Sequence, residues 1–154
     1  ITGEMLSQAQ NRGMTLHQIL TLASIIEKET GREAVSSEQK QNLDAERKTI
    51  AGIFYNRLNI KMPLQSDATV NFVTKKNTPS PSEADTKINS PYNTYKYPGL
   101  PPGPICNPSL SSILAALNPT NSDYLYFLHD QKTGQVFYAS TYEQHLINKQ
   151  KYLK

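Results

Sequence analysis

The sequence has no tryptophan, a single cysteine and little excess of charge of either sign. Its one cysteine, Cys106, excludes a disulfide within the chain. The net charge of +3 is weak and dispersed, and no basic run alternates with aromatic residues, so nucleic acid is not an expected partner. No apolar run approaches the length that spans a membrane, and no signal peptide is visible.

Metal-binding motifs are also missing from the sequence. The three histidines, His17, His129 and His145, are scattered and form no ligand pattern such as HExxH. We therefore expect no metal and no other cofactor. Cys106 could act as a nucleophile with one histidine as its base, but PGPICNPS carries no matching His/Asn signature, and a half-buried loop residue is the favoured interpretation.

What the chain does have is nine tyrosines and ten prolines among 154 residues, a length that fits one domain with its own core. Residues 77–109 are dense in Pro, Ser, Asn and Tyr and have neither a helical nor a strand period. A structureless segment of this length is uncommon inside a domain. We therefore expect an ordered, functional loop.

Two long helices are predicted in the first half of the chain. The first runs from a capping box of Thr15 and Gln18 to a C-terminal glycine, Gly31, and is apolar on most sides. The second begins at Ser36 or Ser37, and its polar first part is either a solvated helix face or a loop leading into the helix.

Shorter elements follow. LQSDATVNFVT indicates a short helix, SLSSILAALNP another that ends at Asn118, and a capping box of Thr141 and Gln144 opens a terminal helix. DYLYFLHDQKTGQVFYAST alternates around Gly134 and predicts a β-hairpin. The fold class is therefore α+β: one mainly helical domain with a β-hairpin and a long ordered Pro/Tyr-rich loop.

The first predicted helix ends on two glutamates, in LTLASIIEKET. Glycosidic bond cleavage needs a protonated carboxyl, whose raised pKa comes from burial against apolar side chains. Glu27 and Glu29 project about 200° apart on a helix, so they cannot both face one cleft. Both have apolar neighbours and the spacing does not choose between them; exposure of both is the more ordinary interpretation, since glutamate is seldom buried unless it is paired.

Other carboxyls have weaker claims to an acid role. Glu33, Glu38 and Glu46 lie in polar surroundings. Asp67 precedes an apolar run, and for this residue a helix N-cap is favoured over catalysis.

Six strings then occur in a fixed order: LASIIEKET, ERKTIAGIFYNRL, MPLQSDATV, YNTY, GLPPGPICNP and YLYFL. With them the chain resembles the YceG-like family of endolytic murein transglycosylases over residues 20–140. Each string alone is weak evidence, but six in order are highly specific. The polar segment 31–44 looks longer than the link typical of the family, which leaves the local helix boundary undefined.

The resemblance implies a substrate and a reaction. The substrate would be peptidoglycan glycan strands, cut at the β-1,4 bond from N-acetylmuramic acid to N-acetylglucosamine in a lysozyme-like cleft. The product would end in 1,6-anhydro-muramic acid, which makes the enzyme a lyase. One glutamate suffices, first as acid and then as base, because the muramic C6 hydroxyl supplies the nucleophile.

The resemblance also implies roles for individual residues. The catalytic glutamate would be the second of EKE, Glu29, with Glu27 as the second choice. Residues of LQSD and YNTY would line the cleft and bind the sugars: Gln65, Ser66, Asp67, Tyr92, Asn93 and Tyr95. Arg57 is interpreted as a structural ion-pair partner, and GLPPGPI as a rigid cleft wall.

Family members usually carry an N-terminal membrane anchor and a small LysM-like domain, and this chain begins at Ile1. We therefore expect residues 1–154 to be the catalytic domain of a longer protein on the extracytoplasmic face of the bacterial membrane, in contact with cell-wall synthesis machinery. Two alternatives stay open: a muramidase that uses water, and a non-catalytic glycan-binding module.

Overall fold

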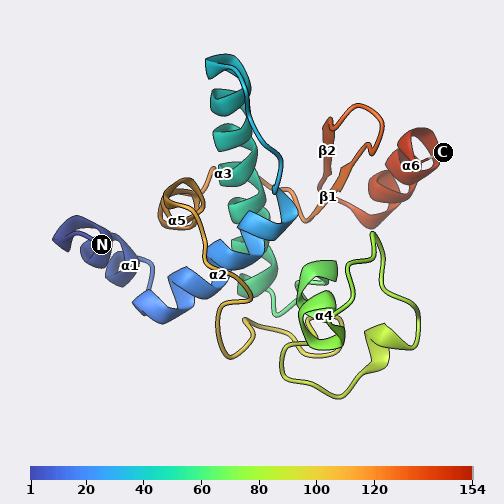
Figure 1. Ribbon diagram of the computed structural model, residues 1–154, viewed down its shortest axis with the longest axis horizontal. Helices are drawn as coiled ribbons and strands as arrows, with labels where there is room; N and C mark the ends of the chain where they lie inside the picture. Colours follow the sequence, from blue (N-terminus) through green and yellow to red (C-terminus); the bar gives the residue numbers. More distant parts are fainter. Residues whose placement is uncertain (154) are drawn as a thin grey trace.

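The computed structural model describes residues 1–153, which form six α-helices, a short 3₁₀ helix and a two-stranded antiparallel sheet (Figure 1). The elements are α1 (Gly3–Asn11), α2 (Leu16–Glu29), α3 (Ser37–Asn59), α4 (Asp67–Thr74), η1 (Asp85–Lys87), α5 (Leu110–Leu117), β1 (Tyr126–His129), β2 (Val136–Ala139) and α6 (Tyr142–Tyr152). The predicted α+β class is confirmed.

Helix α2 is the centre of the fold. Thr15 and Gln18 form the predicted capping box, and the helix packs against α3, α4 and α5. Its side chains are buried on most sides, with Ile19, Leu22 and Ile26 fully enclosed. Because α2 is held by so many neighbours, a side chain at its C-terminal end has a well-defined position.

Helix α3 begins at the capping box of Ser36 and Gln39, so the polar stretch that follows is helical. Its first part rises above the rest of the molecule, and its second part packs on α2 and α5 (Figure 1). Ile50, Ile53 and Phe54 carry that contact into the core. The undefined boundary after α2 is therefore a seven-residue link, residues 30–36, followed directly by helix.

The predicted loop spans residues 77–109, where η1 is the sole helix or strand. Internal hydrogen bonds give it a defined path: the amide of Asn93 donates to the carbonyls of Thr86 and Ile88, both at 2.9 Å. The loop is also tied to the segment just before α4 by a hydrogen bond from the Gln65 backbone amide to the Thr94 carbonyl, at 3.0 Å. An ordered loop is thus confirmed.

The hairpin and α6 lie together at the end of the molecule opposite α1 (Figure 1). Strands β1 and β2 pair with Tyr126 opposite Ala139 and His129 opposite Val136, and Gly134 takes the left-handed conformation that the turn requires (φ 72°). Helix α6 starts at the predicted cap, Thr141, and packs against both strands. The full capping box expected there is wrong, because the Gln144 side chain donates to Asn148 instead of accepting from the Thr141 backbone amide.

One helix was not predicted. Helix α1 is capped by Thr2, and it contributes one buried side chain, Ala9, to the core. Its sequence, GEMLSQAQN, has too few apolar positions to show a helical period.

Candidate active site

Glu29 is the last residue of α2 and lies at a cleft between the helical body and the hairpin. Its carboxylate accepts one hydrogen bond, from the Ser66 hydroxyl at 2.6 Å. Burial raises the pKa of Glu29 above its usual value, and the neighbouring Asp67 raises it further; Ser66, His129 and Arg57 act in the opposite direction without cancelling the rise. Glu29 is therefore suited to hold a proton and give it up.

The cleft has a volume of about 770 Å³. Its walls come from α2, α3, α4, the 77–109 loop, β1 and α6. The side chains around it include Glu29, Arg57, Gln65, Asp67, Pro79, Pro81, Tyr95, Tyr126, His129, Tyr142, His145 and Lys149.

A second hollow, of about 580 Å³, lies on the α4 side of the same glutamate. The two hollows share Glu29, Asp67 and Pro79. The groove therefore continues past the acid in both directions, and Glu29 is at its middle rather than at a closed end.

Asp67 and Tyr95 form a hydrogen-bonded pair beside Glu29. The N-cap expected at Asp67 is wrong, because Ser66 holds that position and Asp67 is the first residue of α4. The Asp67 carboxylate accepts a hydrogen bond from the Tyr95 hydroxyl. Burial raises the pKa of both groups, and the Asp67 charge adds to the rise for Tyr95. The Tyr95 phenol therefore stays protonated, as a hydrogen-bond donor in the cleft.

Arg57 fixes the cleft floor rather than forming an ion pair within residues 1–153. Its guanidinium donates to the carbonyls of Leu125 at 2.6 Å, Pro63 at 3.1 Å and Leu64 at 2.8 Å. These bonds tie α3 to the segment before α4 and to the segment before β1. The expected structural role fits this geometry, but the expected ion-pair partner is wrong, because backbone carbonyls satisfy the side chain.

Glu27 faces away from the cleft. Its carboxylate accepts hydrogen bonds from the Ser109 amide at 3.1 Å, the Ser109 hydroxyl at 2.5 Å and the Ser112 hydroxyl at 2.6 Å, all at the start of α5. Partial burial alone would raise the pKa of Glu27, but these bonds outweigh it and the pKa lies below the usual value. Glu27 is thus a charged partner for the amino end of α5.

The six residues expected to bind sugar have different positions. Gln65, Asp67 and Tyr95 line the cleft. Ser66 is buried behind Glu29. Tyr92 packs on Phe72, with ring centroids 4.9 Å apart, and Asn93 is buried with its amide bonded to loop carbonyls.

Several cleft residues were not singled out from the sequence. Tyr126 and His129 come from β1, and Tyr142, His145 and Lys149 from α6. The last three have helical spacing, a pattern from which one side of α6 could be predicted to face the site. Burial, followed by the charges of Lys149 and Arg57, lowers the pKa of His145 to about 4, so its imidazole is neutral.

Glu46 has polar neighbours, as expected, but it is largely buried rather than exposed. Its side chain is only 10% exposed, accepts a hydrogen bond from Arg32, and lies 2.7 Å from His129 Nε2. The charge is buried because two basic side chains meet it, a tertiary arrangement that neighbours in sequence do not indicate.

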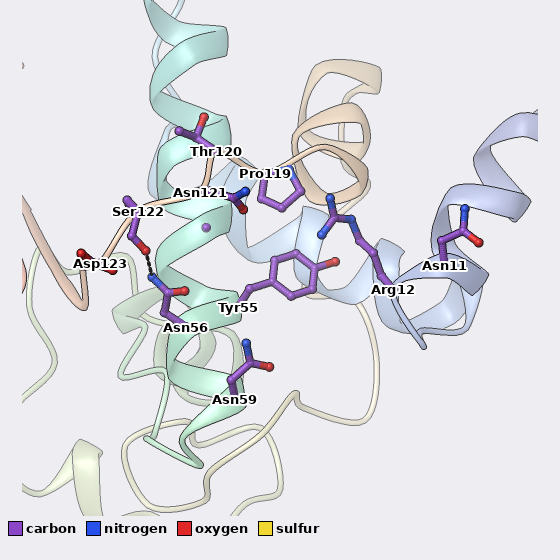
Figure 2. A pocket seen from close by; sticks show the side chains of 11 residues that line it. Asn11, Arg12, Tyr55, Asn56, Asn59, Pro119, Thr120, Asn121, Ser122 and Asp123 are labelled. Atoms are coloured by element: carbon purple, nitrogen blue, oxygen red, sulfur yellow. Dashed lines mark hydrogen bonds between the residues drawn. The ribbon is translucent and has the colours of Figure 1, made fainter.

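Another hollow lies at α1, α3 and the segment after α5, with Arg12 and Tyr55 pointing into it (Figure 2). Asn56 binds the Ser122 carbonyl at 2.8 Å across its edge. The one carboxyl in its lining, Asp123, is exposed. This hollow therefore lacks the buried acid that distinguishes the Glu29 cleft.

Among residues 1–153, no group of three or more His, Cys, Asp and Glu side chains is placed to hold a metal ion. In the same part of the chain, every helix is too short or too polar to cross a bilayer.

The fold and the site define a class: a small α+β domain with a groove open on both sides of one protonatable glutamate. The chain belongs to the YceG-like family, whose model matches residues 2–151. It is 42% identical over 147 residues to the endolytic murein transglycosylase of Bacillus subtilis and 42% identical over 144 residues to that of Streptococcus pneumoniae serotype 2. These matches cover 96% and 90% of this chain.

A crystal structure of a YceG-like protein from Listeria monocytogenes shares the fold, with a TM-score of 0.78 at 42% identity over 94% of this chain. The chain spans 38% of the Bacillus protein, 24% of the Streptococcus protein and 43% of the Listeria chain. The family resemblance seen in the sequence is thus confirmed.

Proposed function

We propose that this domain is an endolytic lytic transglycosylase that cuts the β-1,4 bond from N-acetylmuramic acid to N-acetylglucosamine within peptidoglycan strands. The observation that carries the proposal is Glu29, whose raised pKa and place at the middle of an open groove suit an acid acting on a polymer. The transglycosylase names of the relatives support the same reaction.

In the proposed mechanism, protonated Glu29 gives its proton to the bridging oxygen as the bond to muramic C1 breaks. The resulting carboxylate takes the proton of the muramic C6 hydroxyl while that oxygen bonds to C1. The proton count balances, no water is consumed, and the product is the 1,6-anhydro sugar. The Ser66 hydroxyl, at 2.6 Å, would hold the carboxyl in place in both states.

The remaining cleft residues have proposed binding roles. Gln65, Asp67 and Tyr95 line the groove, so their polar groups are available to sugar hydroxyls and acetamides. Asn93 and Tyr92 lie behind the groove wall, and we assign them the support of the loop that carries Tyr95, since the Asn93 carboxamide oxygen accepts the Tyr95 amide at 3.1 Å.

A muramidase is the second candidate, and one observation favours it. Asp67 lines the same groove as Glu29 and lies near enough to raise its pKa. A second carboxylate is what a glycoside hydrolase uses to activate water or stabilise C1. Because Asp67 is bonded to Tyr95 and partly buried, the lyase remains the leading proposal.

The test compares Glu29→Gln with Glu27→Gln on purified glycan strands, with products identified by mass spectrometry. Glutamine keeps the shape of the side chain but cannot transfer the proton, so Glu29→Gln should lose cleavage by at least about 100-fold while still binding strands. Glu27→Gln should keep cleavage and lower the free energy of unfolding by about 1–2 kcal/mol, because it weakens the charged contact with α5.

The products separate the alternatives. An anhydro end is one water lighter than a hydrolysed end, so reducing ends alone would establish the muramidase. Strand binding by the wild type without any cleavage would establish a glycan-binding module. If cleavage survives in Glu29→Gln and is lost in Glu27→Gln, the acid is Glu27 and the proposed assignment to Glu29 is wrong.

We further propose that the domain works within a longer protein that holds it at the extracytoplasmic face of the membrane, through an N-terminal anchor and alongside a LysM-like domain. The much greater length of the relatives supports a longer protein. Contact with the cell-wall synthesis machinery would follow from that position, and co-purification with the full-length protein would test it.

A further inference from the structure

The hollow on the α4 side of Glu29 has features that acid–base chemistry does not require. Phe72 lines it and is 45% exposed, although it is a large aromatic side chain. Its ring rests against Tyr92, which holds it in place. A fixed and exposed aromatic ring at the edge of a groove is a surface for the apolar face of a ligand.

Lysines surround this aromatic surface. Lys28, Lys75 and Lys76 all line the hollow. Lys76 is neutralised by Asp85, with Nζ 2.9 and 3.0 Å from the two carboxylate oxygens. Lys28 and Lys75 form no ion pair with any side chain in the part of the chain that the structure describes.

The charge of this hollow therefore differs from that of its surroundings. Its two carboxyls are Glu29, which holds a proton when it acts as an acid, and Asp67, which is bonded to Tyr95. The free positive charges of Lys28 and Lys75 are left facing an open space beside the scissile position. Such a site attracts an anionic group joined to a body that packs on Phe72.

We propose that this hollow binds a peptide-bearing muramyl residue of the strand, with Phe72 under the sugar and Lys28 and Lys75 at the carboxylates of its stem peptide. This inference rests on the proposed function, since it names the part of a peptidoglycan substrate that this side of the groove recognises. Strands that carry stem peptides are then cut in preference to strands from which the peptides have been removed.

The experiment measures kcat/KM on two substrates, peptide-bearing strands and the same strands after an amidase has removed the peptides. The ratio of the two values is the readout. For Lys75→Gln the ratio should fall by up to about fivefold, the largest factor that one exposed charge pair supplies. The Lys28→Gln/Lys75→Gln double variant should lower the ratio further. Added salt should lower the wild-type ratio in the same direction. Lys75→Arg, which keeps the charge, should restore it.

Lys61→Gln is the matched control, because Lys61 is also an exposed lysine in the left-handed conformation (φ 56° at both positions) and lies outside both hollows. Its ratio should equal that of the wild type. A ratio unchanged in Lys75→Gln and in the double variant, or lowered equally in Lys61→Gln, overturns the inference. Absence of cleavage of both substrates by the wild type contradicts the proposed function instead, so the two failures are distinguishable.

Discussion

At the scale of single residues, Glu27 and Glu29 have opposite environments although they are two positions apart on one helix. Glu27 receives three hydrogen bonds at the amino end of α5, which favour its charged form. Glu29 receives one, beside a second carboxylate, and is partly buried where it lines the cleft. The pKa of the first is therefore lowered and that of the second raised, so only the second is suited to an acid role.

The hydrogen bond from Ser66 gives a prediction about pH. This bond stabilises the Glu29 carboxylate and so opposes the rise in its pKa. Ser66→Ala removes it, and the pKa of Glu29 should rise further. Because the acid must be protonated, activity is lost as pH increases through this pKa, so the alkaline limb of the kcat/KM profile should move to higher pH.

Ser80→Ala is the control for that profile. Ser80 lines the same cleft but is not hydrogen-bonded to Glu29. The alkaline limb of the kcat/KM profile of Ser80→Ala should therefore coincide with that of the wild type. If the alkaline limb of Ser66→Ala stays in place or moves to lower pH, a group other than Glu29 determines the loss of activity at high pH.

At the scale of elements, α3 depends on a glycine where another segment crosses it. A Cβ at Gly52 would lie 2.1 Å from the carbonyl oxygen of Thr120, whose amide donates to the Lys48 carbonyl at 2.9 Å. Glycine normally weakens a helix, so its presence here reflects the close approach of the segment after α5.

Gly52→Ala should therefore lower the free energy of unfolding, by about 1–3 kcal/mol, because the backbone of Thr120 has to move away. Urea unfolding followed by circular dichroism measures the change. Gly3→Ala is the control: it lies near the start of α1 with no atom within 4 Å of the added Cβ, and should be neutral or slightly stabilising. Equal stability of Gly52→Ala and the wild type would mean that the crossing is looser than described.

Elements set by local chemistry were predictable, and those set by packing were not. The capping boxes at Thr15 and Thr141 and the turn at Gly134 were expected from neighbours within four residues, and the structure has helices and a hairpin at these places. Helix α1 was missed because Ala9 is its only buried residue, so its sequence shows no apolar period, and its cap, Thr2, does not by itself indicate a helix. Contacts with α2 and α5 hold it in place.

The candidate site shows the same limit. The family resemblance indicated Glu29, but the spacing of side chains along the helix could not distinguish it from Glu27. The two glutamates differ in their hydrogen-bond partners, Ser109 for Glu27 and Ser66 for Glu29, and both serines are distant in sequence. The burial of Glu46 against His129 likewise depends on a contact between residues 83 positions apart.

At the scale of the whole molecule, the groove is assembled from segments that run from α2 to α6, and no single element encloses Glu29. Helix α4 and the 77–109 loop form one side, and the hairpin and α6 form the other (Figure 1). Under the proposed function, a chain of sugars would pass through without its end being bound. This shape distinguishes cutting within a strand from removal of units at a terminus.

The open groove predicts how strand length changes during the reaction. Strands labelled at one end should first give labelled fragments with a broad range of lengths, because any bond that reaches Glu29 can be cut. Gel or chromatographic separation at less than one cut per strand measures the distribution. An enzyme that binds the strand end would instead release one short labelled product, or leave the label on a slowly shortening strand. As a control, strands blocked at both ends should be cut at the same rate as unblocked ones, since neither of the two hollows that meet at Glu29 requires a free terminus.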